Sequence, residues 1–387
     1  MLDQNQIYKC KGSHYEMGLQ QGKFFKENAE QVISRFKNLE EIQGIKPKLI
    51  PTNIFLNIAS WKAKKELSPL LEEFAPNQAS RIKGIAEGSG LKENFIYLFC
   101  AAELFLGELD WELPHLKSGC TSIAYTSNKI QNAHTMISRN FDYSDFIVPF
   151  LMVRKNIPKG YNKTWDLTAM VLPGTFNGVN EHGVFISTNE AFPLDERHKG
   201  LSASLLIQEA LEKCSSTQEV IKFFRKMPRG SGNVILVADP SDDLRVMEYT
   251  SNRLYIRKLE KDETFLVATN HYSNQNLKAI DLPREAVFGK DSPQLLQGIC
   301  INKTSYVRKE TAETYLRRKD KININDIKTL HRDHSADPEG TGGMETICHH
   351  DPINISAASM IIDLHDFYGW FCFGSPCQNK YHKFHLK

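Results

Sequence analysis

Near residue 120 the chain changes from helical to strand-like sequence patterns, and this change limits the folds that it can adopt. Upstream, proline and glycine turns separate helical patterns over 52–65, 67–74, 78–86 and 92–106. Downstream, short β-branched and aromatic runs predict strands at 121–126, 133–141, 147–154, 167–172, 182–188, 232–238, 244–249, 253–258, 264–269, 356–364 and 369–373. Helices are expected at 203–213 and 217–226, with further helical residues between 270 and about 330. This order predicts an α+β fold, a four-layer αββα sandwich in which helices enclose two sheets.

The first residues add a short strand and a well-marked helix start. We expect the strand at residues 7–12. Ser13 then occupies an N-cap position, and Glu16 follows at the spacing of a capping box. We therefore divide the chain into a mostly helical segment, 1–119, and an αββα region, 120–387. A separate small helical domain is the alternative for the first segment.

Composition excludes several classes of protein. The 48 basic and 46 acidic side chains leave a net charge of +2, which gives no electrostatic footprint for nucleic acid or for a membrane surface. The N-terminal residues lack the basic end and apolar stretch of a signal peptide, and no segment reaches the length of a membrane span. Eight scattered cysteines fit a reducing compartment, so we expect a cytoplasmic protein in which Cys372 and Cys377 are free thiols.

Cys120 lies at the boundary between the two patterns, in the stretch SGCTSIAY. A free cysteine is most often a small buried hydrophobic residue, and this is the first interpretation of any of the eight. Cys120, however, is preceded by a glycine that lets the backbone bend and is followed at once by a strand. In that position its thiol can attack the preceding peptide bond. If the bond between Gly119 and Cys120 breaks, Cys120 becomes an N-terminus.

Three further motifs follow at strand ends or turns: ISRNFDY at 137–143, NGVNEHG at 177–183 and VATNHY at 267–272. With SGCTS, and in this order, they resemble the N-terminal-nucleophile cysteine hydrolases, which include penicillin V acylase, bile salt hydrolase and the isopenicillin-N acyltransferase family. The acyltransferase branch is more similar because it also carries a long helical segment before the nucleophile. Its opening resembles GSHYEMGLQQG, and its tail resembles LHRDHSADPEG, ICHH and FGSPCQNKYHKF, so the resemblance covers essentially the whole chain.

The resemblance implies a self-processing enzyme with the αββα fold. A precursor zymogen would be cut between Gly119 and Cys120, and its two pieces would stay associated. The freed α-amino group, with an ordinary pKa of about 7.7–8.0, would act as the base for the adjacent thiol. Cys120 would then form an acyl-enzyme with a small-molecule acyl amide or thioester, and water or an amine would resolve it. No cofactor is expected, although a coenzyme A thioester is compatible as acyl donor.

The resemblance also implies roles for individual residues. Arg139 would favour the thiolate of Cys120, and Asp142 would hold the α-amino group. Uncharged amides suit an oxyanion, so Asn270 would donate to it with Asn180 as partner, and each asparagine has a turn residue as its alternative. Arg332 resembles the late arginine of the family, with a surface ion pair as an equal alternative. The acyl group is expected to meet aromatic residues, among them Phe141, Tyr143, Phe146 and Trp165.

Other interpretations remain open. A zinc site is suggested by several residues close in sequence, namely His331, His334, Cys348, His349 and His350, but no C-x-x-C or H-E-x-x-H spacing supports it, and we expect no metal. A papain-like pair would need His271 as base, without the papain signature around Cys120. An unprocessed enzyme and a non-catalytic binding protein are further alternatives. The motifs do not decide between a hydrolase and an acyltransferase, since both use the same acyl-enzyme.

Overall fold

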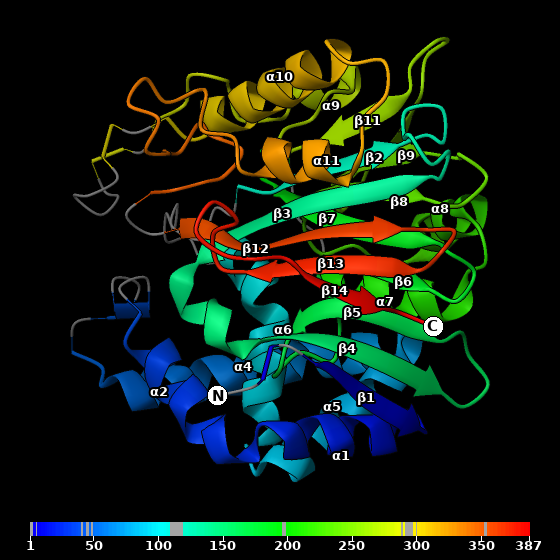
Figure 1. The fold of residues 1–387 in the computed structure, drawn as a ribbon. Coiled ribbons are helices and arrows are strands. Elements are labelled where there is room, and N and C mark those ends of the chain that lie inside the picture. Colours follow the sequence, from blue (N-terminus) through cyan, green and yellow to red (C-terminus); the bar gives the residue numbers. More distant parts are fainter. Residues whose placement is uncertain are drawn as a thin grey trace.

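Two β-sheets form the centre of the computed structural model (Figure 1). The structure describes residues 3–4, 6–39, 42–43, 46–47, 49–108, 119–195, 199–287, 289–290, 297–298, 300–351 and 354–387, with backbone alone for 102–108. No helix in these ranges is long and apolar enough to cross a membrane.

The larger sheet has eight strands in the order β1-β4-β5-β6-β7-β8-β9-β10. Its strands are β1 (Ile7–Gly12), β4 (Leu151–Pro158), β5 (Thr164–Ala169), β6 (Asn177–Asn180), β7 (Phe185–Ala191), β8 (Gly232–Ala238), β9 (Arg245–Tyr249) and β10 (Leu254–Lys258). All neighbours are antiparallel except β1, which pairs in parallel with β4 from Ile7 opposite Val153 to Gly12 opposite Pro158. The N-terminal segment therefore supplies the edge strand of this sheet.

The smaller sheet has six antiparallel strands in the order β11-β2-β3-β12-β13-β14. Its strands are β2 (Thr121–Tyr125), β3 (Met136–Ser144), β11 (Phe265–Ala268), β12 (Asn354–Asp363), β13 (Tyr368–Phe373) and β14 (His382–His385). The strand that follows Cys120 thus lies between β3 and β11, inside the sheet and away from its edges.

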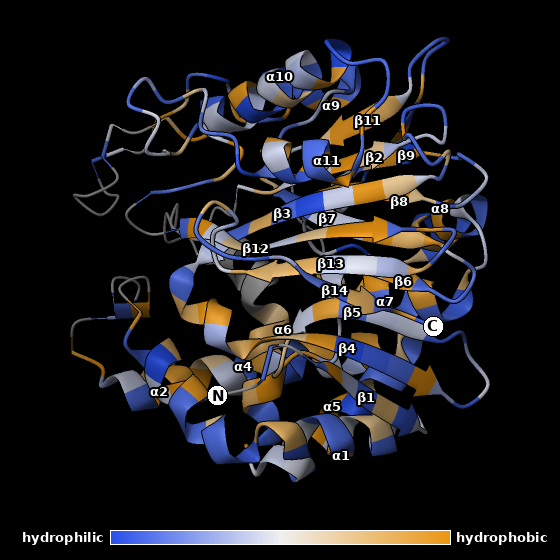
Figure 2. Ribbon diagram, in the orientation of Figure 1, coloured by the Kyte–Doolittle hydropathy of each residue, from blue (hydrophilic) through white to orange (hydrophobic). Residues whose placement is uncertain are grey.

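The two sheets pack face to face. Successive side chains of a strand point to opposite faces, so each strand contributes both to the core between the sheets and to the contact with the outer helices. On β2, Ala124 joins the large core between the sheets, whereas Ile123 and Tyr125 join a second cluster with the helices on the other side. Figure 2 shows hydrophobic residues along strands such as β11 and β12, and largely hydrophilic connecting loops. The predicted αββα sandwich is confirmed.

Helices cover the outer face of each sheet. The smaller sheet is covered by α10 (Lys303–Arg317) and α11 (Ile324–His331), and the short α9 (Gln275–Lys278) follows β11. The larger sheet carries α7 (Ala203–Lys213) and α8 (Thr217–Lys226) together with the N-terminal helices. The N-terminal elements are α1 (His14–Phe24), α2 (Ala29–Lys37), α4 (Thr52–Phe74), α5 (Pro76–Ser89) and α6 (Glu93–Glu108), with a 3-10 turn over Lys26–Asn28.

Glycines bring α1 and α5 into backbone contact. A Cβ added to Gly18 would lie 2.2 Å from the Arg81 carbonyl oxygen, and one added to Gly84 would lie 2.1 Å from that of Tyr15. Gly22 and Gly88 make the same kind of approach one turn further along. The GSHYEMGLQQG segment is therefore a packing surface. The predicted capping box of Ser13 and Glu16 is present at its start.

Several predicted boundaries were wrong for local reasons. The helices expected at 52–65 and 67–74 are one helix that runs through Pro69. The strand expected at 147–154 begins as a 3-10 helix over Asp145–Phe150, which contains Pro149, and becomes extended only at Leu151. The N-terminal segment is not a separate helical domain, since β1 completes the larger sheet.

Candidate active site

Cys120 is buried at the start of β2, with 1% of its surface exposed. The adjacent strand β3 pairs with β2 so that Thr121 faces Asn140 and Ser122 faces Arg139. This register places Arg139 beside Cys120, and its Nη2 donates a hydrogen bond to the Cys120 Sγ at 3.2 Å. The site therefore places a buried guanidinium in direct contact with the Cys120 sulfur.

The guanidinium of Arg139 is held by bonds across the sheet interface. Its Nη1 donates to the Phe176 carbonyl at 2.9 Å and to the Asn177 Oδ1, and its Nη2 also donates to the Thr188 carbonyl. Its Cζ lies 5.1 Å from the centre of the Phe141 ring on the same strand. These contacts with the opposite sheet leave Arg139 little freedom to leave the cysteine.

A second buried arginine, Arg308, reaches Cys120 from α10. Its Nη1 donates to the Cys120 carbonyl oxygen at 2.6 Å and to the Thr121 Oγ1 at 2.9 Å, and its Nη2 donates to the Asn270 Oδ1 at 3.0 Å. Burial lowers the pKa of Arg308, and the nearby Asp142 and Cys120 oppose this shift. Arg308 was not among the residues predicted from the sequence.

Asp142 approaches Gly119 with an oxygen that has no hydrogen-bond partner. Its Oδ1 accepts from the Ser356 Oγ at 2.6 Å, whereas its buried Oδ2 accepts from no group in the described part of the chain. A Cβ placed on Gly119 would lie 3.3 Å from this Oδ2 and 3.2 Å from the Arg308 Nη2. Burial raises the pKa of Asp142 to about 6, against the influence of His349, Arg308 and Arg139.

Asn270 is linked to the same cluster through Arg308. Its backbone N–H donates to the Ser305 Oγ at 2.7 Å, and its Nδ2 donates to the Glu190 carbonyl at 2.9 Å. The next residue, His271, bonds to the same Ser305 Oγ at 2.8 Å and stacks on Tyr306. Burial and nearby cations lower the pKa of His271 to about 2, so a papain-like base at this position has no support.

Aromatic side chains continue from Arg139 along β3. Phe141 stacks on Phe176 at 4.7 Å and on Tyr143 at 5.6 Å, and Tyr143 lies 6.2 Å from Phe146. Phe141 is buried and Tyr143 is partly buried, and Phe141 belongs to the core between the sheets, as Cys120 does. Phe141, one of the aromatic residues expected to meet the acyl group, thus lies against Arg139.

Residues 129–377, more than half of the chain, match the family model for the acyl-coenzyme A:6-aminopenicillanic acid acyl-transferases. The chain belongs to this acyl-transferase family. The match begins nine residues after Cys120. Among curated proteins none matches this chain.

Among the solved structures that match this chain are three hydrolases, each with a TM-score of 0.41. An N-acylethanolamine-hydrolyzing acid amidase ortholog from Caenorhabditis elegans is 16% identical, over 63% of this chain and 93% of that one. A penicillin V acylase from Agrobacterium tumefaciens is 17% identical, over 66% and 83%. A mutant of the conjugated bile acid hydrolase from Clostridium perfringens is 11% identical, over 68% and 96%.

Two residues that the acyl-transferase resemblance suggested lie outside the Cys120 cluster. Both amide hydrogens of Asn180 are donated to carbonyls at the end of α7, one to Leu211 at 2.9 Å and one to Cys214, the residue after the helix, at 2.6 Å. Its Oδ1 accepts from the backbone N–H groups of His182 and Val184, which makes it the turn residue of the alternative interpretation. It therefore has no amide hydrogen left for an oxyanion.

Arg332 ends α11 and contacts the C-terminal turn. Its Nε donates to the Pro376 carbonyl at 2.8 Å, and its guanidinium lies over the Tyr381 ring. Among the described residues it is Arg308, and not Arg332, that contacts Cys120 from this part of the chain. A signal for Arg308 was present in the sequence, because it lies on the buried face of its helix, a face that consists of Thr304, Ser305, Arg308, Ala312 and Leu316. A charged residue within such a buried stripe indicates a buried partner.

Proposed function

We propose that this acyl-transferase family member is a self-processing amidohydrolase whose nucleophile is Cys120. The observation that carries the proposal is the contact between the Arg139 Nη2 and the Cys120 Sγ, at the first residue before a central strand. The thiolate attacks the carbonyl carbon of Gly119, and the peptide bond is exchanged for a thioester while the Cys120 nitrogen takes up a proton. Water then hydrolyses the thioester, which frees the Gly119 carboxylate and the α-amino group and thiol of Cys120.

The residues around Cys120 suit each step after this cleavage. The α-amino group removes the thiol proton, and the unpartnered Oδ2 of Asp142 accepts a hydrogen bond from that amine. The thiolate attacks the substrate carbonyl, and the second Nδ2 hydrogen of Asn270 stabilises the oxyanion. Collapse of the intermediate expels the amine or thiol of the substrate and leaves an acyl-enzyme.

The stacked rings of Phe141, Tyr143 and Phe176 favour a substrate with an apolar acyl chain. The substrate is therefore proposed to be a small acyl amide. Water as acceptor makes the protein a hydrolase. The family name adds a second candidate, transfer of the acyl group from coenzyme A to an amine, in which the same acyl-enzyme is resolved by the amine.

The test is the intact mass of the purified protein under denaturing conditions. The expected result is two polypeptides, residues 1–119 and 120–387, with the larger one beginning at Cys120. Cys120→Ala should remain a single chain and should lack acyl-enzyme formation. Cys214→Ala removes another buried thiol at the end of α7 and should be cleaved as the wild type is.

Two results would contradict the proposal. A Cys120→Ala protein that is still cleaved after Gly119 would show that the thiol is not needed for processing. A wild-type protein that stays intact on long incubation would leave Cys120 without a free α-amino group, and the unprocessed enzyme or the binding protein would then be favoured.

A further inference from the structure

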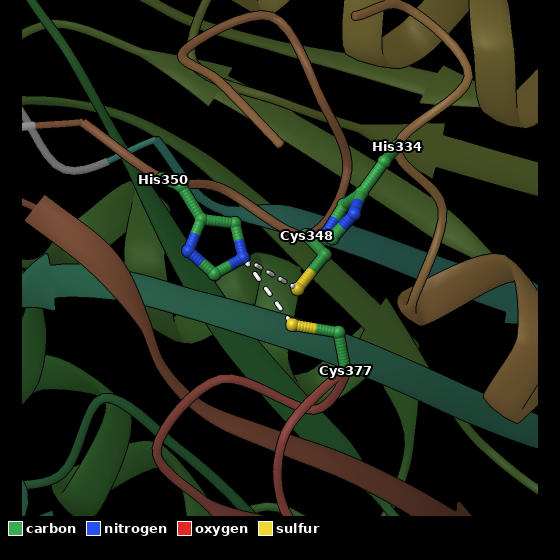
Figure 3. A group of neighbouring side chains, drawn as sticks. All are labelled: His334, Cys348, His350 and Cys377. Carbon is green, nitrogen blue, oxygen red and sulfur yellow. Dashed lines mark hydrogen bonds between the residues drawn. The ribbon is translucent and has the colours of Figure 1, made fainter. Parts of the chain in front are cut away.

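Four metal-binding side chains meet between the loop after α11 and the C-terminal turn (Figure 3). They are His334, Cys348, His350 and Cys377, and each offers one nitrogen or sulfur atom within 4.8 Å of all the others. We infer that these residues bind one Zn²⁺ ion. Two thiolates and two imidazoles are the donor set that zinc takes in closed structural sites.

The distances within the group agree with a tetrahedral site. The His350 Nε2 lies 3.4 Å from the Cys348 Sγ and 3.4 Å from the Cys377 Sγ. Around a tetrahedral zinc, with Zn–S of about 2.3 Å and Zn–N of about 2.0–2.1 Å, neighbouring donor atoms lie about 3.3–3.8 Å apart. Figure 3 shows both sulfur atoms pointing toward the imidazole of His350.

His334 supplies the second, independent observation. Its buried Nε2 has no hydrogen-bond partner in the described part of the chain, while its Nδ1 lies 3.2 Å from the Gly340 carbonyl oxygen. A proton on Nδ1 donated to that carbonyl fixes the tautomer that leaves Nε2 unprotonated, as a metal ligand requires. The unpartnered nitrogen is thus already turned toward the other three donors.

A glycine makes room for both imidazoles. Gly342 has a φ of +97°, and a Cβ on it would lie 2.4 Å from the His350 Cδ2 and 3.1 Å from the His334 Nε2. Any other residue would therefore be strained at this position and would displace a ligand. Backbone bonds also shape the loop, from Cys348 N–H to the Asp333 carbonyl and from His350 N–H to the Gly343 carbonyl.

The other histidines of this region are used elsewhere. His331 is buried between the Asn140 Oδ1 and the Ser138 Oγ, and burial lowers its pKa to about 3. His349 bonds to the Asp351 carboxylate. The sequence expectation that no metal binds came from the spacing of neighbouring residues, and it did not consider Cys377, which follows Cys348 by 29 positions.

The proposed site fastens the loop that supports Asp142 to the C-terminal turn. Cys348 and His350 flank His349, whose backbone N–H donates to the Ser356 Oγ at 2.9 Å, and that hydroxyl donates to the Asp142 Oδ1. A closed site with four protein ligands has no open position for catalysis, so its zinc stabilises structure. The ion would fasten the C-terminal turn to the loop that holds this chain of hydrogen bonds.

The first test measures metal without reference to activity. Wild-type protein, purified without chelators or metal-affinity resin, is expected to contain about one zinc per chain by plasma mass spectrometry. Cys377→Ser should lower the zinc content at least about tenfold. Cys377 is exposed, so the change is compatible with folding, and Cys300→Ser, which alters another partly accessible thiol, should retain the metal.

The second test uses the wild-type chain alone. Alkylation with N-ethylmaleimide followed by peptide mapping should find Cys377 protected before treatment with a chelator and labelled after it, with the melting temperature lowered by the same treatment. Zinc-free protein in which Cys377 is labelled at once would overturn the inference. So would a disulfide between Cys348 and Cys377, detected as a linked peptide that a reductant, but not a chelator, releases.

Discussion

At Cys120 the buried charges are set by two arginines and one carboxylate. Arg139 contacts the sulfur, and Arg308 contacts the carbonyl of the same residue. Both guanidinium groups are buried, and they favour the ionised form of Asp142, which the burial of that carboxyl group disfavours. In a cleaved chain an ammonium would add a third positive charge. The two nearby guanidinium groups therefore favour the neutral amine, which is the form that acts as a base.

Asp142 gives the first prediction, which concerns the pH dependence of stability. Its pKa is raised by burial from 3.8 to about 6, so the folded protein holds its proton more tightly than the unfolded chain does. The stability from this protonation is complete below pH 4 and is lost as the pH rises through 6. In a Cys120→Ala background, Asp142→Asn should therefore gain free energy of unfolding relative to Asp142 between pH 4 and pH 7, by at most about 3 kcal/mol.

Denaturant unfolding across this pH range measures that difference. The exposed Asp145, three residues further on, provides the control, and Asp145→Asn should show no such change with pH. A difference between the Asp142→Asn protein and its parent that stays constant from pH 4 to pH 7 would mean that burial does not raise the pKa of this carboxyl group.

Proximity in sequence decided which site residues could be predicted. Arg139 and Asp142 lie on the strand next to Cys120, so a short motif contained them both. Arg308 lies 188 residues from Cys120, and only the packing of α10 against the smaller sheet brings it there. The role predicted for Asn180 has no support from its contacts. A turn asparagine and an oxyanion asparagine have the same sequence signature, and the four hydrogen bonds of Asn180 are those of a turn residue held at the end of α7.

At the scale of elements, α10 holds the start of β2 and the residue before it, Cys120. Arg308 spans the Cys120 carbonyl, the Thr121 hydroxyl and the Asn270 amide from one position of this helix. A lysine ammonium keeps the charge but lacks the planar fork that reaches all three. We expect Arg308→Lys to slow self-cleavage by about 10²-fold, because the bond before Cys120 loses its alignment. Mass spectrometry of the precursor over time measures this rate.

Two substitutions of the same kind serve as comparisons. Arg317→Lys changes an exposed residue of the same helix and should cleave at the wild-type rate. Arg332→Lys tests the arginine suggested by the family resemblance, and it should also cleave normally. Should Arg332→Lys lose cleavage while Arg308→Lys retains it, the assignment of the late arginine would have to be reversed.

The elements themselves were more predictable than their boundaries. Helices 203–213 and 217–226 and the strand 232–238 were predicted with the observed limits, since each has a strong pattern between clear turns. The short strands β6 (NGVN) and β14 (HKFH) were missed because they lack the continuous apolar, β-branched run that predicted β11, which is equally short. Pro69 does not end α4, although proline interrupts most helices, and packing of α4 on α6 favours continuation.

At the scale of the whole molecule, a buried polar network joins the N-terminal segment to the rest. Gln21 donates to the Met170 and Leu172 carbonyls and accepts from the Arg154 guanidinium, and His14 lies 2.7 Å from the Glu212 carboxylate. These groups would lose their partners if the segment left, and β4 would lose the strand paired to its edge. The segment is thus part of the fold.

Because of this interface, the two segments should associate whether or not one is cut from the other. Residues 1–119 and 120–387, produced as two polypeptides in one cell, should assemble and elute together in size-exclusion chromatography. The complex should survive salt of about 1 M, at which the Debye length is about 3 Å, because the Arg81–Glu212 ion pair across it is fully buried and little screened. Residues 120–387 produced alone should aggregate, since the apolar face beneath α1 and α5 would be exposed. A stable, monomeric and soluble 120–387 fragment would show instead that the segment is a dispensable cover.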